Sequence, residues 1–119
     1  MDYKKKLYSI EWLVIPAPDI QKARIFYSNV FNFQLTEYNE SFTLFKAGNI
    51  SGALDSSLKP SINSLSFSIT VDDILEVSDK ILQYGGVIIK ETYSLGGNLG
   101  VCAQFADPNG NILELYSTK

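Results

Sequence analysis

Apolar and polar residues alternate along several short stretches of the chain, as they do in β-strands with one buried face. The clearest stretch is 64–71, where one face carries only apolar side chains and the other only serine and threonine. Residues 8–15 form a similar short apolar run. Further strands are predicted at 33–38, 41–46, 50–54, 87–92, 101–106 and 111–116.

Two other segments carry apolar residues three and four positions apart, which is the spacing of an amphipathic helix. The first begins after Asp19 and reaches Val30, and the second begins after Asp73. Each aspartate suits the N-cap position, because its carboxylate accepts a hydrogen bond from an exposed backbone N–H. Gly85 and Gly86 are predicted to end the second helix, since glycine adopts the left-handed conformation found there.

The predicted elements occur twice in the same order, and the two halves match when the chain is shifted against itself. A shift of 54 residues places Asp19-Ile20 on Asp73-Ile74. A shift of 62 places Gly48-Asn49-Ile50 on Gly110-Asn111-Ile112. The difference between the shifts, eight residues, coincides with the glycine-rich stretch 94–100. The sequence therefore predicts a duplicated βαβββ module.

The predicted architecture is one α+β domain with helices covering one face of the strands. A length of 119 residues fits a single domain. The first module spans about 8–54 and the second about 64–119, with a linker at about 55–63 that contains Pro60.

Charge and composition restrict the classes of partner. A net charge of −3 with scattered lysines lacks the basic surface of a nucleic-acid-binding protein. The run Lys4-Lys5-Lys6 is interpreted as a solvated tail. No stretch approaches the roughly 20 apolar residues of a transmembrane helix. We therefore expect neither a nucleic acid nor a membrane as a partner.

Cysteine usage predicts a cytoplasmic protein. Cys102 is the only cysteine, so an intramolecular disulfide is impossible. Its apolar surroundings in the sequence favour a small buried residue over a reactive thiol. Charged and polar residues near the N-terminus interrupt the apolar core that a signal peptide requires.

Several strings of residues resemble the glyoxalase, bleomycin-resistance and extradiol-dioxygenase proteins of the vicinal oxygen chelate superfamily. The first half offers Ile15-Pro16, Asp19 and Phe26-Tyr27. The second half offers Phe105-Ala106-Asp107-Pro108-Asn109-Gly110-Asn111, followed by Glu114. The resemblance covers nearly the whole chain. It implies a curved mixed sheet around a cup, helices on the outer face, and a homodimer that completes the site.

In metal-dependent members of this superfamily, four strand positions supply the metal ligands. The resemblance places them at Trp12, Gly52, Ser66 and Glu114, which are related by the same two shifts. Divalent metals favour histidine and carboxylate ligands, and catalytic sites need about three protein ligands. Of these four residues only Glu114 has a side chain that binds a divalent metal strongly, and the chain contains no histidine. Neither a cofactor nor a divalent metal is therefore expected.

Alternation along the strands predicts which side chains line the cup. The predicted ligand-binding residues are Trp12, Ser66, Ser68, Glu114 and Tyr116. An indole, two hydroxyls, a phenol and a carboxylate suit a small aromatic or cationic ligand. Two structural alternatives remain: Trp12 could fill the space of a lost metal, and Glu114 could hydrogen-bond Ser66. Glu114 is also the candidate general acid or base.

Other residues have structural interpretations. Tyr27 is assigned to the core, and Asp107 and Asn109 to the turn before the last strand. The stretch 94–100 is either a lid over the cup or a long hairpin connection.

Three hypotheses about function follow. The first is a metal-free protein of the bleomycin-resistance type that binds a small organic molecule. The second is a glyoxalase-type lyase or isomerase that uses Glu114 with a divalent metal. The third is a structural or regulatory subunit.

Overall fold

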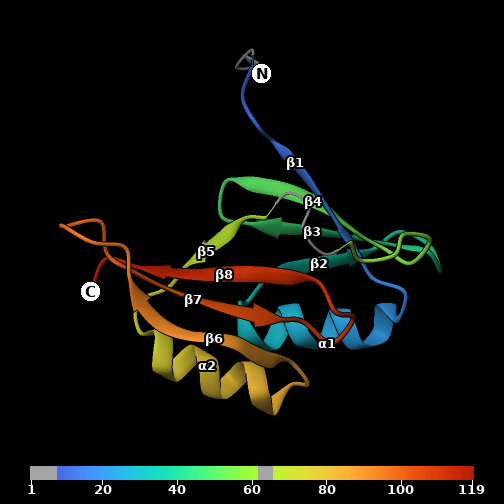
Figure 1. The fold of residues 1–119 in the computed structure, drawn as a ribbon. Helices are drawn as coiled ribbons and strands as arrows, with labels where there is room; N and C mark the ends of the chain where they lie inside the picture. The colour runs from blue at the N-terminus through green and yellow to red at the C-terminus, as the bar shows by residue number, and fades with distance from the viewer. Residues whose placement is uncertain (1–7, 62–65) are drawn as a thin grey trace.

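The computed structural model describes residues 8–61 and 66–119, which form two consecutive βαβββ modules (Figure 1). The first module contains β1 (Trp12–Pro16), α1 (Ile20–Val30), β2 (Gln34–Glu37), β3 (Phe42–Ala47) and β4 (Ile50–Asp55). The second contains β5 (Ser68–Thr70), α2 (Ile74–Gln83), β6 (Val87–Ser94), β7 (Val101–Ala106) and β8 (Ile112–Ser117). The predicted α+β class and the duplicated module are confirmed.

Each module forms its own four-stranded mixed sheet, so the strands of the predicted curved sheet are divided between two sheets. Their strand orders are β1-β4-β3-β2 and β5-β8-β7-β6. In each sheet the first strand is parallel to the last, and the other pairs are antiparallel. β1 and β5 therefore occupy equivalent edges of the two sheets.

One apolar core joins the two modules. Both helices lie on the same side of the strands in Figure 1. The Phe26 ring of α1 contacts the Phe105 ring of β7, with the centroids 6.1 Å apart. The core also holds the fully buried Leu54 and Leu115 from the two sheets. Burying each such side chain contributes roughly 1.5–3 kcal/mol, so the modules stabilise each other.

The helix termini follow the sequence pattern. Asp19 accepts a hydrogen bond from the Lys22 backbone N–H at 3.2 Å, and Asp73 accepts one from the Leu75 backbone N–H at 3.0 Å. Gly85 has a φ of +95°, and it follows α2 as predicted. Neither helix of the described chain is long and apolar enough to cross a membrane.

Three strands are shorter than predicted: β2 covers Gln34–Glu37 of the predicted 33–38, and β1 and β5 differ more. β1 begins at Trp12 instead of residue 8, because β4 begins at Ile50 and the parallel ladder ends where the Ser51 N–H donates to the Glu11 carbonyl. β5 covers Ser68–Thr70 of the predicted 64–71. Residues 64 and 65, like part of the predicted linker and the basic run at 4–6, lie outside the described residues. Asp55, assigned to the linker, is the last residue of β4.

The turn before β8 connects the modules through the buried carboxylate of Asp107. The Tyr27 hydroxyl of α1 donates to this carboxylate at 2.7 Å, and the Asn111 side chain donates to it at 2.8 Å. The backbone N–H groups of Asn109 and Asn111 also donate to it, at 2.8 and 3.0 Å. The Asn111 side chain in addition donates to the Pro16 carbonyl at 2.6 Å. Asp107 therefore shapes the turn, as predicted, and also binds the first module.

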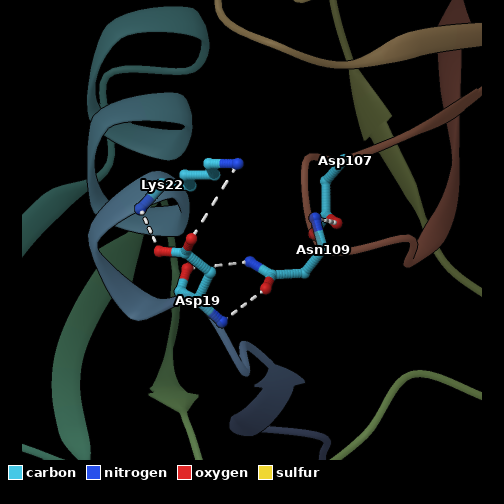
Figure 2. Close-up of polar contacts among 4 residues, drawn as sticks. All are labelled: Asp19, Lys22, Asp107 and Asn109. Carbon is cyan, nitrogen blue, oxygen red and sulfur yellow. Dashed lines mark hydrogen bonds and ion pairs between the residues drawn. The ribbon is translucent and has the colours of Figure 1, made fainter.

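Asn109 forms a second connection, to the backbone at the start of α1. Figure 2 shows its side chain directed at Asp19, where its amide oxygen accepts from the Asp19 N–H at 2.6 Å. Its amide nitrogen donates to the Asp19 carbonyl at 3.0 Å. We refer to Asp19, Tyr27, Asp107, Asn109 and Asn111 together as the inter-module clasp.

Candidate functional site

The face of each sheet that points away from the helices, which we call the open face, carries the predicted site residues. On β1, Trp12 is 53% exposed, whereas Ile15 is buried in the core. On β8, Leu113 and Leu115 are buried in the core, whereas Glu114 between them is only half-buried. The alternation predicted for these strands is therefore confirmed.

Gly52 is an exception, and its assignment to one of the four superfamily ligand positions is wrong. It pairs with Leu13 on one side and with Phe45 on the other, and both side chains pack toward the core. A Cβ at this position would collide with the Leu13 carbonyl oxygen and would lie 2.6 Å from the Phe45 ring. Gly52 therefore allows close packing on the helix side of the sheet.

The position equivalent to Glu114 is Ala53, 61 residues earlier. Ala53 pairs with Val14 just as Glu114 pairs with Ser68, and Val14 and Ser68 are related by the shift of 54. The shift of 62 was read from the turn residues, but the β3–β4 turn and the β7–β8 turn differ in length. Ala47 pairs with Ile50 across the first turn, whereas residues 107–111 form the longer second turn. A one-residue change of register moves a side chain to the opposite face of a sheet.

The second sheet brings three of the five predicted binding residues together. Ser68 pairs directly with Glu114, and Tyr116 lies two residues further along β8 on the same face. Ser66 is exposed and precedes β5. Among the described residues no hydrogen bond joins Ser66 to Glu114, so that structural alternative is not supported. Trp12 lies on the other sheet, on β1.

Two residues that the sequence did not single out for the site, Tyr93 and Cys102, lie near Glu114 on this open face. They pair across β6 and β7. Burial raises the pKa of the Cys102 thiol, and the negative charge of Glu114 raises it further. The pKa of Tyr93 is raised by the same causes in the same order. Both groups are therefore protonated at neutral pH, and Cys102 is not an activated nucleophile.

Tyr93 was missed because a register shift of β6 precedes it. The Lys90 ammonium lies 4.0 Å from the centre of the Tyr93 ring, which is a cation–π contact. Alternation along β6 alone does not place Tyr93 on the open face, since register shifts between residues 88 and 93 change which side chains share a face.

The stretch 94–100 is the connection of the β6–β7 hairpin, and a hydrogen bond from Tyr116 holds it to the open face. The Tyr116 hydroxyl donates to the Leu99 carbonyl at 2.7 Å. The Leu95 N–H donates to the Gly100 carbonyl at 3.0 Å. Gly100 has a φ of +97°, and a Cβ there would lie 3.0 Å from the Tyr116 hydroxyl. Tyr116 therefore positions this loop with the same hydroxyl that was predicted for a ligand.

The donor atoms at the four superfamily positions do not fit a metal centre. The positions hold Trp12, Ala53, Ser66 and Glu114, of which only Glu114 is a strong ligand for a divalent ion. In residues 8–61 and 66–119, no three His, Cys, Asp or Glu side chains lie close enough together to hold a metal ion. A catalytic metal normally needs about three protein ligands, so we derive no step through one.

Comparisons with known proteins agree with this fold. A structure of a glyoxalase/bleomycin resistance protein/dioxygenase family enzyme from Burkholderia phytofirmans PsJN is 18% identical, with a TM-score of 0.78 over 92% of this chain and 98% of that chain. The fosfomycin resistance protein FosX from Listeria monocytogenes is 18% identical, with a TM-score of 0.69 over 96% and 94%. Lactoylglutathione lyase from Agrobacterium tumefaciens is 20% identical, with a TM-score of 0.68 over 95% and 96%.

These identities are low, so the three likenesses establish the fold alone. No curated protein sequence matches the chain. The sequence profile of one superfamily, however, matches residues 9–115, which is nearly the whole chain. The resemblance inferred from the sequence is thereby confirmed. The chain belongs to the Glyoxalase/Bleomycin resistance protein/Dioxygenase superfamily.

Proposed function

We propose that the protein binds a small organic molecule on its open faces without a metal ion. One observation carries this proposal: the four superfamily positions hold an exposed indole, a methyl group, a hydroxyl and a single carboxylate. An aromatic face and one carboxylate suit a cationic or aromatic ligand, whereas they lack the donors that hold a metal. The free thiol of Cys102 supports a cytoplasmic location.

A second copy of the chain is proposed to complete the site. β1 and β5 are edge strands, and the open face of β1 carries Trp12 at 53% exposure. Along the preceding residues, Tyr8 is 103% exposed and Ile10 is 81% exposed. Exposed apolar side chains beside an open strand edge favour association with another chain. Light scattering after size exclusion is expected to give a dimer for the wild type and a monomer for Ile10→Lys.

Trp12 provides the direct test of ligand binding, because it is the only tryptophan of the chain. A library of small aromatic amines and aromatic acids is titrated while the Trp12 fluorescence is recorded. We expect a saturable change with an amine, and a weaker affinity in Glu114→Gln, which keeps the shape of the side chain and removes its charge. Glu40→Gln, in the exposed β2–β3 connection, is the matched control.

The other two hypotheses predict different outcomes of the same work. Stoichiometric zinc or nickel in the purified protein, together with turnover of a hemithioacetal that Glu114→Gln abolishes, would support a lyase or isomerase and refute the proposal. Trp12 fluorescence that ignores every compound in the library would instead favour a structural or regulatory subunit.

A further inference from the structure

A cavity of about 570 Å³ lies between the two modules, separate from the Trp12 and Glu114 positions. It is bounded by the end of the β3–β4 hairpin and by β5, which lie side by side in Figure 1. Its wall is mainly apolar and includes Phe31, Phe33, Phe45 and Phe67. Sites for small ligands typically measure roughly 300–1,000 Å³ and combine an apolar wall with a few polar groups. This inter-module cavity has the size and the wall of such a site.

The charge at the cavity is positive. Lys46 is the single charged side chain among the described residues that line it. No ion pair of Lys46 is found in the described parts of the chain. A cation beside an apolar cavity favours a ligand that carries a negative charge next to an apolar body.

β5 contributes backbone donors to the same cavity. The Phe67 carbonyl accepts from the Glu114 N–H at 3.1 Å, and the Val71 N–H donates to the Tyr116 carbonyl at 2.8 Å, so these groups face β8. Backbone groups point to alternate sides along a strand, and those of Ser68 and Thr70 therefore point to the opposite edge. Among the described strands β8 is the single sheet neighbour of β5, and both Ser68 and Thr70 line the cavity. Edge N–H groups are suitable donors to a carboxylate oxygen.

We propose that the inter-module cavity binds an amphipathic carboxylate. The apolar body of this ligand lies among the phenylalanine rings, and its carboxylate lies at Lys46 and the outward N–H groups of β5. Trp12 and Glu114 do not line this cavity, whereas Ser68, which pairs with Glu114, does, so the cavity is a second site that borders the open face of the second sheet.

Decanoate, kept below its micelle concentration, is the probe. Two-dimensional ¹H–¹⁵N spectra of the full chain are recorded as decanoate is added. We expect saturable shifts at Lys46–Gly48 and at Ser68–Thr70. Removing the charge in Lys46→Gln is expected to weaken binding about fivefold to tenfold, as for a partly exposed charged hydrogen bond. Lys80→Gln, on α2 and away from the cavity, is the matched control and should bind as the wild type does.

Decanol and decyltrimethylammonium carry an alkyl chain similar to that of decanoate without its negative charge, and both are expected to bind more weakly than decanoate. Lys46→Gln changes an exposed side chain, so its spectrum should show an intact fold. Four outcomes would overturn the proposal: no saturable shift with decanoate, equal affinity in Lys46→Gln, equal affinity for decanol, or shifts confined to Trp12 and Glu114. The last outcome would place the carboxylate on the open face and would also contradict the preference for a cationic ligand proposed there, whereas the first three outcomes leave that proposal intact.

Discussion

Replacing Tyr27 with phenylalanine removes one hydroxyl from the inter-module clasp and keeps the ring. The ring is fully buried, and it stacks on Phe33 with the centroids 5.3 Å apart and meets Phe26 edge-on at 5.0 Å. These contacts survive the substitution. What is lost is the 2.7 Å hydrogen bond to the Asp107 carboxylate. Tyr27→Phe therefore isolates one bond between the two modules.

The expected cost is about 1.5–3 kcal/mol, because hydrogen bonds to charged groups contribute that much to stability. The Asp107 carboxylate still accepts from the Asn111 side chain at 2.8 Å, so the variant leaves no orphaned acceptor. With an m value of about 1.5 kcal/mol per molar, urea unfolding should shift to lower concentration by about 1–2 M. Tyr38→Phe, at a residue that is 71% exposed, is the control and should change stability by less than about 0.5 kcal/mol.

Asp107→Ala should cost more than Tyr27→Phe. It leaves the Tyr27 hydroxyl and the backbone N–H groups of Asn109 and Asn111 without their acceptor, and each unsatisfied buried group costs roughly 1–3 kcal/mol. If Tyr27→Phe unfolds at the same urea concentration as Tyr38→Phe, or if Asp107→Ala is the milder change, the clasp does not stabilise the protein as described.

The same bond has a pH signature. Burial raises the pKa of Tyr27 well above the ordinary value of 10.0, and the Asp107 carboxylate raises it further. The folded state therefore holds this proton more tightly than the unfolded state does. The resulting stability is fully present below about pH 10, and it is lost as the pH rises further. The advantage of the wild type over Tyr27→Phe should shrink between pH 9 and pH 11, and a constant difference would show that Tyr27 titrates equally in both states.

Further predictions concern the first sheet and the 94–100 connection. Gly52→Ala should lower the free energy of unfolding by about 1–3 kcal/mol, because a Cβ collides with the Leu13 carbonyl; urea unfolding measures it, and an unchanged midpoint would contradict the packing. Tyr116→Phe should speed amide hydrogen exchange at residues 95–100 while changing global stability by about 1 kcal/mol or less, since only the bond to Leu99 is lost. Unchanged exchange there would show that Tyr116 does not hold the connection.

Much of the fold could be predicted from the sequence because its signals are local. Alternation identifies strands, a spacing of three and four identifies helices, and aspartate side chains mark both helix starts. Asp19 and Asp73 bind backbone N–H groups at their own helices, within three residues along the chain. The family resemblance likewise rests on contiguous strings, and the profile match confirms it.

The faces of the candidate site were partly predictable. Trp12 and Glu114 lie on open faces as alternation requires, because the period of a strand is an intrinsic property of its backbone. Their ligand-binding roles remain predictions. Gly52 was misplaced because its face depends on pairing with Leu13 and Phe45, and the turn residues used to count the register lie in hairpins of different length.

The contacts between distant segments were decided by the tertiary structure alone. The Tyr27–Asp107 bond spans 80 residues, and the bonds between Asp19 and Asn109 span 90. Both partners of each pair have an adequate local interpretation, as a core residue, a helix cap or a turn residue. Sequence periodicity describes each element in isolation, whereas these bonds depend on how two modules dock around one core. The sequence by itself therefore determined the duplicated elements, and only their packing decided the clasp, the register at Gly52 and the cavity between the modules.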